Sequence, residues 1–318
     1  MNWRALVASA SPRVAVGIAP DRVTAITLGR AGGVPAVTAH ASEALPPGAV
    51  EASLTAPNFA DPARVVAALR TVFDRLGQRP RRLALALPDT VGKVSLLRFD
   101  KVPARADDLD QLIRFQVRKA APFRLEDAQV TYSPGAPLDG GGREYVVVVA
   151  RRDVVKEYED ACVGAGAQAG LVDLATLNVI NAVLTRSDRR PGDWLLVHVT
   201  SHCATVAILR DGHLIFYRTR GDEADGNLAG LVHQTAMYYE DRLGGSGFSK
   251  VLLVGGAAAY SGMESGDWLR RNLQERLRSQ VDVVGPDAVR FSERIGVDAA
   301  TVDAYMPLVG LLTRTPRV

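Results

Sequence analysis

The feature that most constrains the fold is a pattern of strands that occurs twice in the chain. Residues 14–33 read VAVGIAPDRVTAITLGRAGG, and residues 195–214 read LLVHVTSHCATVAILRDGHL. Each segment has an apolar stretch of strand length, a tight turn, a second apolar strand and a glycine-bearing turn into a third. Two such hairpins, each opening one half of the chain, predict a duplicated α/β fold with a cleft between the halves.

Helices and further strands follow each hairpin. In the first half, apolar residues at helical spacing predict a helix that begins at Asp61-Pro62 and ends at Gly77. Strands are expected over residues 81–88 and 93–100. In the second half we expect the following elements: a helix over 225–243, the strand KVLLVGGAA, a helix over 268–277, the strand QVDVVGP and a closing apolar helix over 301–312.

The segment between the halves has a different order of elements. Its patterns predict helix, strand, strand, helix, strand and helix, and the linker DRRPGD follows. This order suggests a compact insertion. We therefore predict a first lobe over residues 1–102, an inserted subdomain over 103–187 and a second lobe over 188–318, with the helix over 301–313 packing back on the first lobe.

Composition narrows the classes of function. The 318 residues are 47% hydrophobic, which is enough for two lobes with cores of their own. No apolar run approaches the ~20 residues that span a bilayer, and the N-terminal MNWRALVASASPR is interpreted as a short cytoplasmic lead-in. The net charge of +3 is interspersed along the chain, which gives no support to nucleic-acid binding. Cys162 and Cys203 share no motif spacing and are expected to be buried, reduced thiols.

Several segments, in collinear order, resemble one family. The strand-turn-strand VGIAPDRVTAITL is similar to the opening of PilM, the actin-like protein of type IV pilus assembly. QVRKAAPFRLEDAQVTY resembles that family's helix, Pro-Phe turn and strand. VVVVARRDVVKEYEDACVGAGAQAGLVDLATLNVINAV, DWLLVHVTSHCATVAILRDGHLIFYR and VLLVGGAA are similar to its later blocks. The cytoplasmic part of the secretion protein GspL resembles the same frame.

The resemblance implies a fold, a cofactor and a partner. The fold would be actin-like, with two ribonuclease-H-like halves and an inserted FtsA-type α+β subdomain. Members of the family sit in the bacterial cytoplasm, hold ATP in the interlobe cleft and capture the N-terminal tail of PilN, a bitopic inner-membrane protein. We expect the tail in a groove between the first lobe and the insertion, and we predict these partner-binding residues: Arg114, Phe115, Arg118, Pro122 and Phe123.

The chain departs from the family at both phosphate-binding turns. In the first turn, Ala19 stands where the family has an acid, and Pro20 and Asp21 occupy a shortened loop. Proline offers no N–H, and an aspartate repels phosphate. In the second turn, His198 replaces the acid and Thr200 replaces a glycine. The degenerate nucleotide cleft is predicted to comprise Gly17, Ala19, Asp21, Thr24, His198, Thr200, Ser201, Gly226, Gly255 and Gly256, with the last two resembling an adenosine-side glycine pair.

These departures favour a scaffold that has lost ATP hydrolysis, because Mg²⁺ needs oxygen ligands and phosphoryl transfer needs charge neutralisation. Two alternatives of the same fold stay open: a nucleotide-switched ATPase of the same machinery, and a sugar or small-molecule kinase, which would need a cleft aspartate. His198, His202 and Cys203 could be imagined as metal ligands, but they straddle a strand–turn junction, so no metal site is predicted. Self-association is possible, and pilus and secretion systems are not distinguished.

Overall fold

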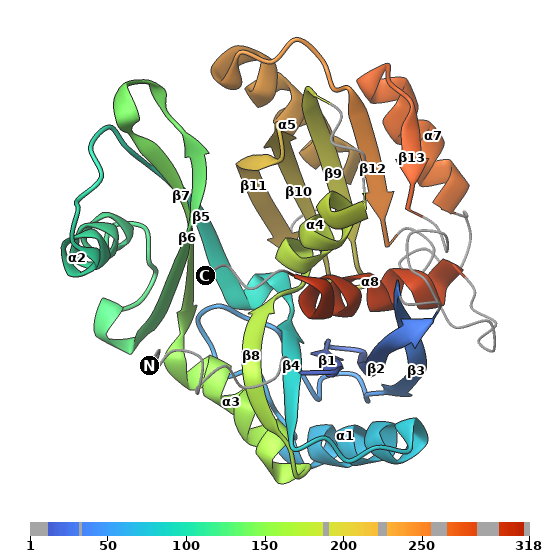
Figure 1. Cartoon of the computed structure of the whole chain (residues 1–318). Coiled ribbons are helices and arrows are strands. Elements are labelled where there is room, and N and C mark those ends of the chain that lie inside the picture. The colour runs from blue at the N-terminus through green and yellow to red at the C-terminus, as the bar shows by residue number, and fades with distance from the viewer. Residues whose placement is uncertain are drawn as a thin grey trace.

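Two five-stranded sheets form the body of the molecule (Figure 1). The computed structural model describes residues 12–31, 34–186, 191–221, 228–255, 266–284 and 299–314. The strands of the first sheet are β1 (Val14–Ile18), β2 (Arg22–Ala31), β3 (Val34–Ala44), β4 (Arg82–Leu87) and β8 (Gln168–Leu174). The strands of the second sheet are β9 (Asp193–Val199), β10 (Cys203–Arg210), β11 (His213–Gly221), β12 (Lys250–Val254) and β13 (Val281–Val283).

The two sheets share one topology. Their strand orders are β3-β2-β1-β4-β8 and β11-β10-β9-β12-β13. In each sheet the first three strands form an antiparallel meander. The last two strands then run parallel to the first. The duplication predicted from the two hairpins is therefore confirmed at the level of strand pairing.

Helices α1 (Pro62–Leu76) and α3 (Arg152–Gly164) cover the outer face of the first sheet (Figure 1). The predicted ends of α1 are confirmed. Asp61 caps its start by accepting a hydrogen bond from the backbone N–H of Arg64 at 3.1 Å. Gly77 ends the helix with a φ of 65°, a left-handed conformation that costs glycine little. Leu69 of α1 and Tyr158 of α3 are both fully buried in this layer.

A second helical layer lies between the two sheets. It consists of α4 (Ala175–Arg186) and α8 (Ala299–Thr313), which pack on each other and share one apolar cluster with both sheets. The helices approach closely at Gly310, where an added Cβ would lie 1.8 Å from the Asn178 carbonyl oxygen. Helix α8 also packs on β1, β2 and β4 of the first sheet. Because helices cover both faces, every residue of β9 is buried.

The outer face of the second sheet is covered by α5 (Leu228–Leu243) and α7 (Gly266–Leu277), which enclose a third apolar cluster. The layers are therefore helix, sheet, helix, sheet and helix. The burial predicted for Cys162 and Cys203 is confirmed. Among the helices of the described ranges, none combines the length and apolar character needed to span a bilayer.

A small third sheet stands at the side of this body. It has the order β5-β7-β6, from β5 (Gly92–Phe99), β6 (Ala128–Pro137) and β7 (Arg143–Arg151), and α2 (Ala106–Val117) packs on one of its faces (Figure 1). Two of the strand pairings do not follow the order of the elements along the chain. β5 precedes residue 103 yet pairs with β7, whereas β8 lies within 103–187 yet pairs with β4 of the first sheet. Order along the chain did not show which edge each strand would join, and the division into folding units stays a prediction.

Candidate functional site

The turn of the first hairpin uses its own backbone groups. The N–H of Ala19 donates to the carbonyl of Arg22 at 2.9 Å, which closes the turn around Pro20. The Asp21 carboxylate lies 3.0 Å from the Arg22 guanidinium at the surface. On the strands below, Thr24 pairs with Gly17 and is buried. Two backbone positions of this turn therefore offer nothing to a phosphate. Pro20 has no N–H, and the N–H of Ala19 already donates to Arg22.

The turn of the second hairpin is closed by a threonine side chain. The Oγ1 of Thr200 accepts from the backbone N–H of Cys203 at 3.1 Å and lies 3.5 Å from that of His202. The N–H of Thr200 donates to the Cys203 carbonyl at 2.9 Å. Ser201 is exposed at the tip of the turn. The amides of Thr200 and Cys203, two of those that could bind an anion, thus form hydrogen bonds within the turn.

Gly255 follows β12 and meets the backbone of the neighbouring strand. Its φ of 91° favours glycine, and an added Cβ would lie 1.7 Å from the Val199 carbonyl oxygen. This contact accounts for glycine at position 255 through packing alone. Gly226 and Gly256, the other predicted cleft glycines, lie outside the described residues.

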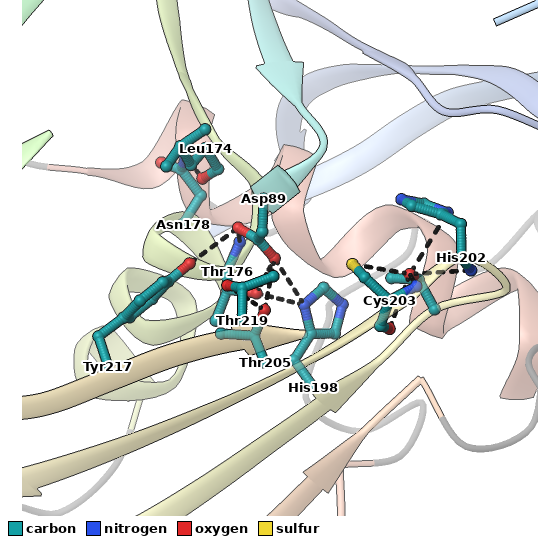
Figure 2. Close-up of polar contacts among 11 residues, drawn as sticks. Asp89, Leu174, Thr176, Asn178, His198, His202, Cys203, Thr205, Tyr217 and Thr219 are labelled. Atoms are coloured by element: carbon teal, nitrogen blue, oxygen red, sulfur yellow. Dashed lines mark hydrogen bonds and ion pairs between the residues drawn. The ribbon is translucent and has the colours of Figure 1, made fainter. Parts of the chain in front are cut away.

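A buried aspartate that the sequence analysis did not single out lies between the two hairpins. Asp89 follows β4, in the single 3-10 turn Asp89–Val91, and is 2% exposed. Its carboxylate accepts hydrogen bonds from the Thr205 hydroxyl at 3.1 Å and from the Tyr217 hydroxyl at 2.9 Å (Figure 2). It also accepts from the backbone N–H of Thr176 at 2.9 Å and from the hydroxyl of the same residue. Thr176 lies in the first turn of α4, so Asp89 acts there as an N-terminal cap.

His198 completes this cluster from β9. Its Nδ1 lies 2.6 Å from the Thr176 hydroxyl oxygen and 3.8 Å from the Asp89 carboxylate. The Thr176 hydroxyl has one proton, which it donates to Asp89, so the His198 Nδ1 carries a proton and donates to Thr176. Burial lowers the pKa of His198, with His202 acting in the same direction and Asp89 against it. The imidazole is therefore neutral at pH 7.

Tyr217 is held in its neutral form as well. Burial raises its pKa well above the usual value, and the neighbouring Asp89 charge adds to this effect. All four hydrogen bonds to Asp89 thus come from uncharged donors. A carboxylate has about four lone-pair positions, and here four donors occupy them.

These groups border a pocket between the lobes, which we call the interlobe pocket. Its cavity measures about 120 Å³ and is lined from both hairpins, with Asp89 and, from α8, Asp303. Of the predicted cleft residues, the structure brings these together: Gly17, Ala19, Asp21, Thr24, His198, Thr200, Ser201 and Gly255. Within the described ranges, no three His, Cys, Asp or Glu side chains form a group that could hold a metal ion.

Three groups that could serve a magnesium–phosphate group are already engaged within the protein. The amides of Ala19 and Cys203 are engaged within their own turns, and the Asp89 oxygens accept four bonds. Asp89 is a cleft aspartate of the kind that a kinase would need, but its lone pairs already accept hydrogen bonds. A general base needs a free lone pair directed at the proton it removes.

The predicted partner residues lie elsewhere, on α2 and the turn after it. Phe115 is 63% exposed, and Arg114 pairs with Asp110 at 2.6 Å. Arg118, Pro122 and Phe123 line a shallow hollow of about 440 Å³ at the end of the helix. The structure thus brings part of the predicted set together, on the face of the small sheet that packs against α2.

The opposite face of the small sheet borders a second cavity, which we call the side groove. It measures about 480 Å³. Its walls come from β6 and β7, from β8 and α4, and from the turn between β10 and β11. Asp173 and Arg314 lie in it and form an ion pair at 3.0 Å. Burial raises the pKa of Asp173, although Arg314 acts in the other direction.

Comparison with known proteins identifies the family. Residues 15–226 match the sequence model of the family described as type IV pilus assembly protein PilM. The chain belongs to the PilM family. A search of curated protein sequences gave no match.

Solved structures show the fold of this PilM-family chain to be actin-like. A chain of the PilM–PilN type IV pilus biogenesis complex matches with a TM-score of 0.79 and 17% identity, over 95% of this chain and 98% of that one. A Bacteroides thetaiotaomicron protein with an actin-like ATPase fold matches with a TM-score of 0.53 and 11% identity, over 96% and 97%. The cytoplasmic domain of EpsL, an inner-membrane component of the type II secretion system of Vibrio cholerae, matches with a TM-score of 0.50 and 10% identity, over 95% of both chains.

Sequence reasoning about this PilM-family chain missed Asp89 and its donors. The only local signal was Pro88-Asp89 directly after a buried strand, at the edge of a sheet where ligands are often bound. Its donors Thr176, Thr205 and Tyr217 lie 87 to 128 residues further along the chain. No spacing rule connects groups so far apart.

Proposed function

We propose that this PilM-family protein is a cytoplasmic scaffold of a type IV pilus inner-membrane assembly complex. In this role it binds the N-terminal cytoplasmic tail of a PilN-like membrane protein and does not hydrolyse ATP. Family membership supports the pilus role, and the likeness to a chain of a PilM–PilN complex supports the choice of partner. The protein would reach the inner membrane through that partner.

The observation that carries this proposal is the side groove. Its walls come from β6 and β7, from β8 and α4, and from the turn between β10 and β11, and β6 is an edge strand of the small sheet. An extended peptide can pair with the free edge of a strand while its side chains enter neighbouring pockets. Val146 and Val148 present apolar surface there, and Thr131 and Ser133 present hydroxyls. The groove thus suits an extended peptide of mixed polarity.

The interlobe pocket supports the second half of the proposal. Hydrolysis needs a metal ion and donors directed at the transferred phosphate. In the described part of the chain, the turn amides of Ala19 and Cys203 and the Asp89 carboxylate are already engaged. Calorimetric titration with ATP, with and without Mg²⁺, tests this directly. No heat at millimolar nucleotide is expected, and micromolar binding would revive the nucleotide-switched alternative.

The partner site is tested with a synthetic peptide of the N-terminal cytoplasmic tail of a PilN-like protein from the same organism. We expect Thr131→Arg to abolish binding measured by calorimetry, because Thr131 is an exposed residue of the groove wall. Gln129→Arg is the matched control, since Gln129 is exposed on the same strand and face but lies outside the groove. Equal loss in both variants would contradict the groove.

The same titration decides between the groove and the surface predicted from the sequence. Phe115→Ala removes the exposed aromatic ring of α2, which lies on the other face of the small sheet. Binding to the groove predicts unchanged affinity in this variant. Loss of binding in Phe115→Ala with retention in Thr131→Arg would place the tail on α2 instead.

A further inference from the structure

The Asp89 cluster connects the two lobes through hydrogen bonds. We define it as Asp89, Thr176, His198, Thr205, Tyr217 and Thr219. Asp89 directly follows β4 of the first sheet, while Thr205 lies on β10 and Tyr217 on β11 of the second. Figure 2 shows Thr205 and Tyr217 directed at the carboxylate from strands of the second sheet, with Thr176 and His198 beside it. One buried group of the first lobe is therefore bonded to two strands of the second lobe and to the helix between the sheets.

Each hydroxyl proton of the cluster is donated towards Asp89. Thr205 donates to Asp89, so its hydroxyl oxygen accepts from Thr219, which lies 2.9 Å away. Thr176 donates to Asp89 and accepts from His198 by the same argument. Both series of hydrogen bonds end at the Asp89 carboxylate, and consecutive hydrogen bonds of this kind polarise and strengthen one another. The arrangement is complete within the protein.

We propose that the Asp89 cluster is a lock that holds the two lobes in a single arrangement without any bound ligand. Hydrogen bonds weaken steeply with distance and angle, whereas apolar contacts tolerate small sliding movements. Rotation of one lobe would pull Thr205 and Tyr217 away from Asp89. The carboxylate would then lose the two donors that the second lobe supplies. The arrangement in which Asp89 is bonded to both strands of the second lobe is thereby favoured over one in which a lobe has rotated away.

The lock has a consequence for the side groove, and this consequence alone rests on the proposed function. The groove takes one wall from the small sheet, whose strand β5 directly follows the Asp89–Val91 turn, and another from the turn between β10 and β11, the strands that carry Thr205 and Tyr217. Locked lobes keep these walls at a constant separation. The affinity for a tail peptide would then not depend on nucleotide.

Distances between spin labels in the full chain test the lock itself. Ala67→Cys on α1 and Arg271→Cys on α7 place labels at exposed positions on the outer layers of the two lobes. The native thiols are buried and so are shielded from labelling. With Asp89 intact we expect one narrow distance distribution, unchanged by millimolar Mg-ATP. In Asp89→Ala we expect a shift towards longer and broader distances.

A matched control separates the lock from general loss of stability. Asp193 is also a buried carboxylate, but its partners Arg210 and Tyr239 belong to its own lobe. Asp193→Asn should leave the label distances unchanged. If it shifts them as Asp89→Ala does, or if Asp89→Ala leaves them unchanged, the lock is refuted.

A milder variant keeps the test decisive if Asp89→Ala does not fold. Tyr217→Phe retains the ring and removes one donor from the second lobe. We expect a smaller shift in the same direction. An unchanged distribution in this variant, with Asp89→Ala unfolded, overturns the proposal. Loss of tail binding without any change in distance would concern the proposed function and leave the lock standing.

Discussion

The close approach of α4 and α8 predicts that Gly310→Ala destabilises the protein, against the usual effect of this change. Alanine in place of glycine inside a helix normally stabilises by about 1 kcal/mol. Here the new Cβ would lie 1.8 Å from the Asn178 carbonyl oxygen and 2.6 Å from its carbon. Optimal contact between non-bonded carbon atoms is about 3.5 Å or more, so the helices would have to separate by more than roughly 1 Å.

The size of the loss follows from what that separation disturbs. The atoms in the way are backbone atoms of α4, which cannot rotate aside as a side chain could. Overpacking of a core typically costs about 1–3 kcal/mol, and this backbone clash belongs at the upper end. After the helix-propensity gain, we expect a net loss of about 2 kcal/mol. For a chain of this size that corresponds to a fall in melting temperature on the order of 5 °C.

Thermal melting and guanidinium denaturation, both followed by circular dichroism, measure this loss. Gly164→Ala is the control, because Gly164 ends α3 and a Cβ there would first meet a side-chain methyl of Val66, at 3.0 Å. That methyl can move, so the control should change stability by no more than about 0.5 kcal/mol. If Gly310→Ala melts at or above the temperature of the parent chain, the helices do not approach as described and the reasoning is wrong.

Three further predictions concern the second lobe and the pocket. Gly255→Ala should destabilise the protein in denaturation by more than the loss of about 2 kcal/mol expected for Gly310→Ala, because a backbone clash at 1.7 Å is added there to a positive φ. Gly48→Ala shares the positive φ but meets no atom within 4 Å, and should cost only about 1 kcal/mol. Because the folded-state pKa of His198 is lowered, the unfolded chain binds a proton there first. Stability should therefore fall as pH drops below about 6.5, by at most about 1.4 kcal/mol per pH unit, down to the lowered folded pKa, and a His198→Asn variant should lose this slope in denaturation measured from pH 7.5 to 4.5. Tyr239→Phe removes a buried hydroxyl that donates at 2.7 Å to a carboxylate and should cost about 1–3 kcal/mol in denaturation, whereas Tyr238→Phe at its exposed neighbour should cost nothing measurable.

Local patterns in the sequence determined the elements and the duplication. Period-two alternation, helical spacing, the Asp61 cap and the Gly77 end are all effects of residues within one or two turns of each other. The resemblance to the PilM family also rests on local patterns, because it consists of short similar segments in the same order along the chain. The prediction that both phosphate turns are degenerate rests likewise on single residues such as Pro20 and Thr200.

Only the tertiary structure decided which elements pair and which polar groups meet. β8 follows the helix–strand series of the insertion but pairs with β4. The backbone groups of a strand pair with the strand that lies beside them in the fold, whatever the order of the two along the chain. Asp89 looked like the end of a strand, and its four donors were identified only once the two sheets and α4 were packed together. The partner residues predicted on α2 and the side groove lie on opposite faces of one sheet. Sequence patterns report the periodicity of one element, whereas a buried hydrogen-bond cluster or a groove depends on where distant elements meet in space, which no local pattern records.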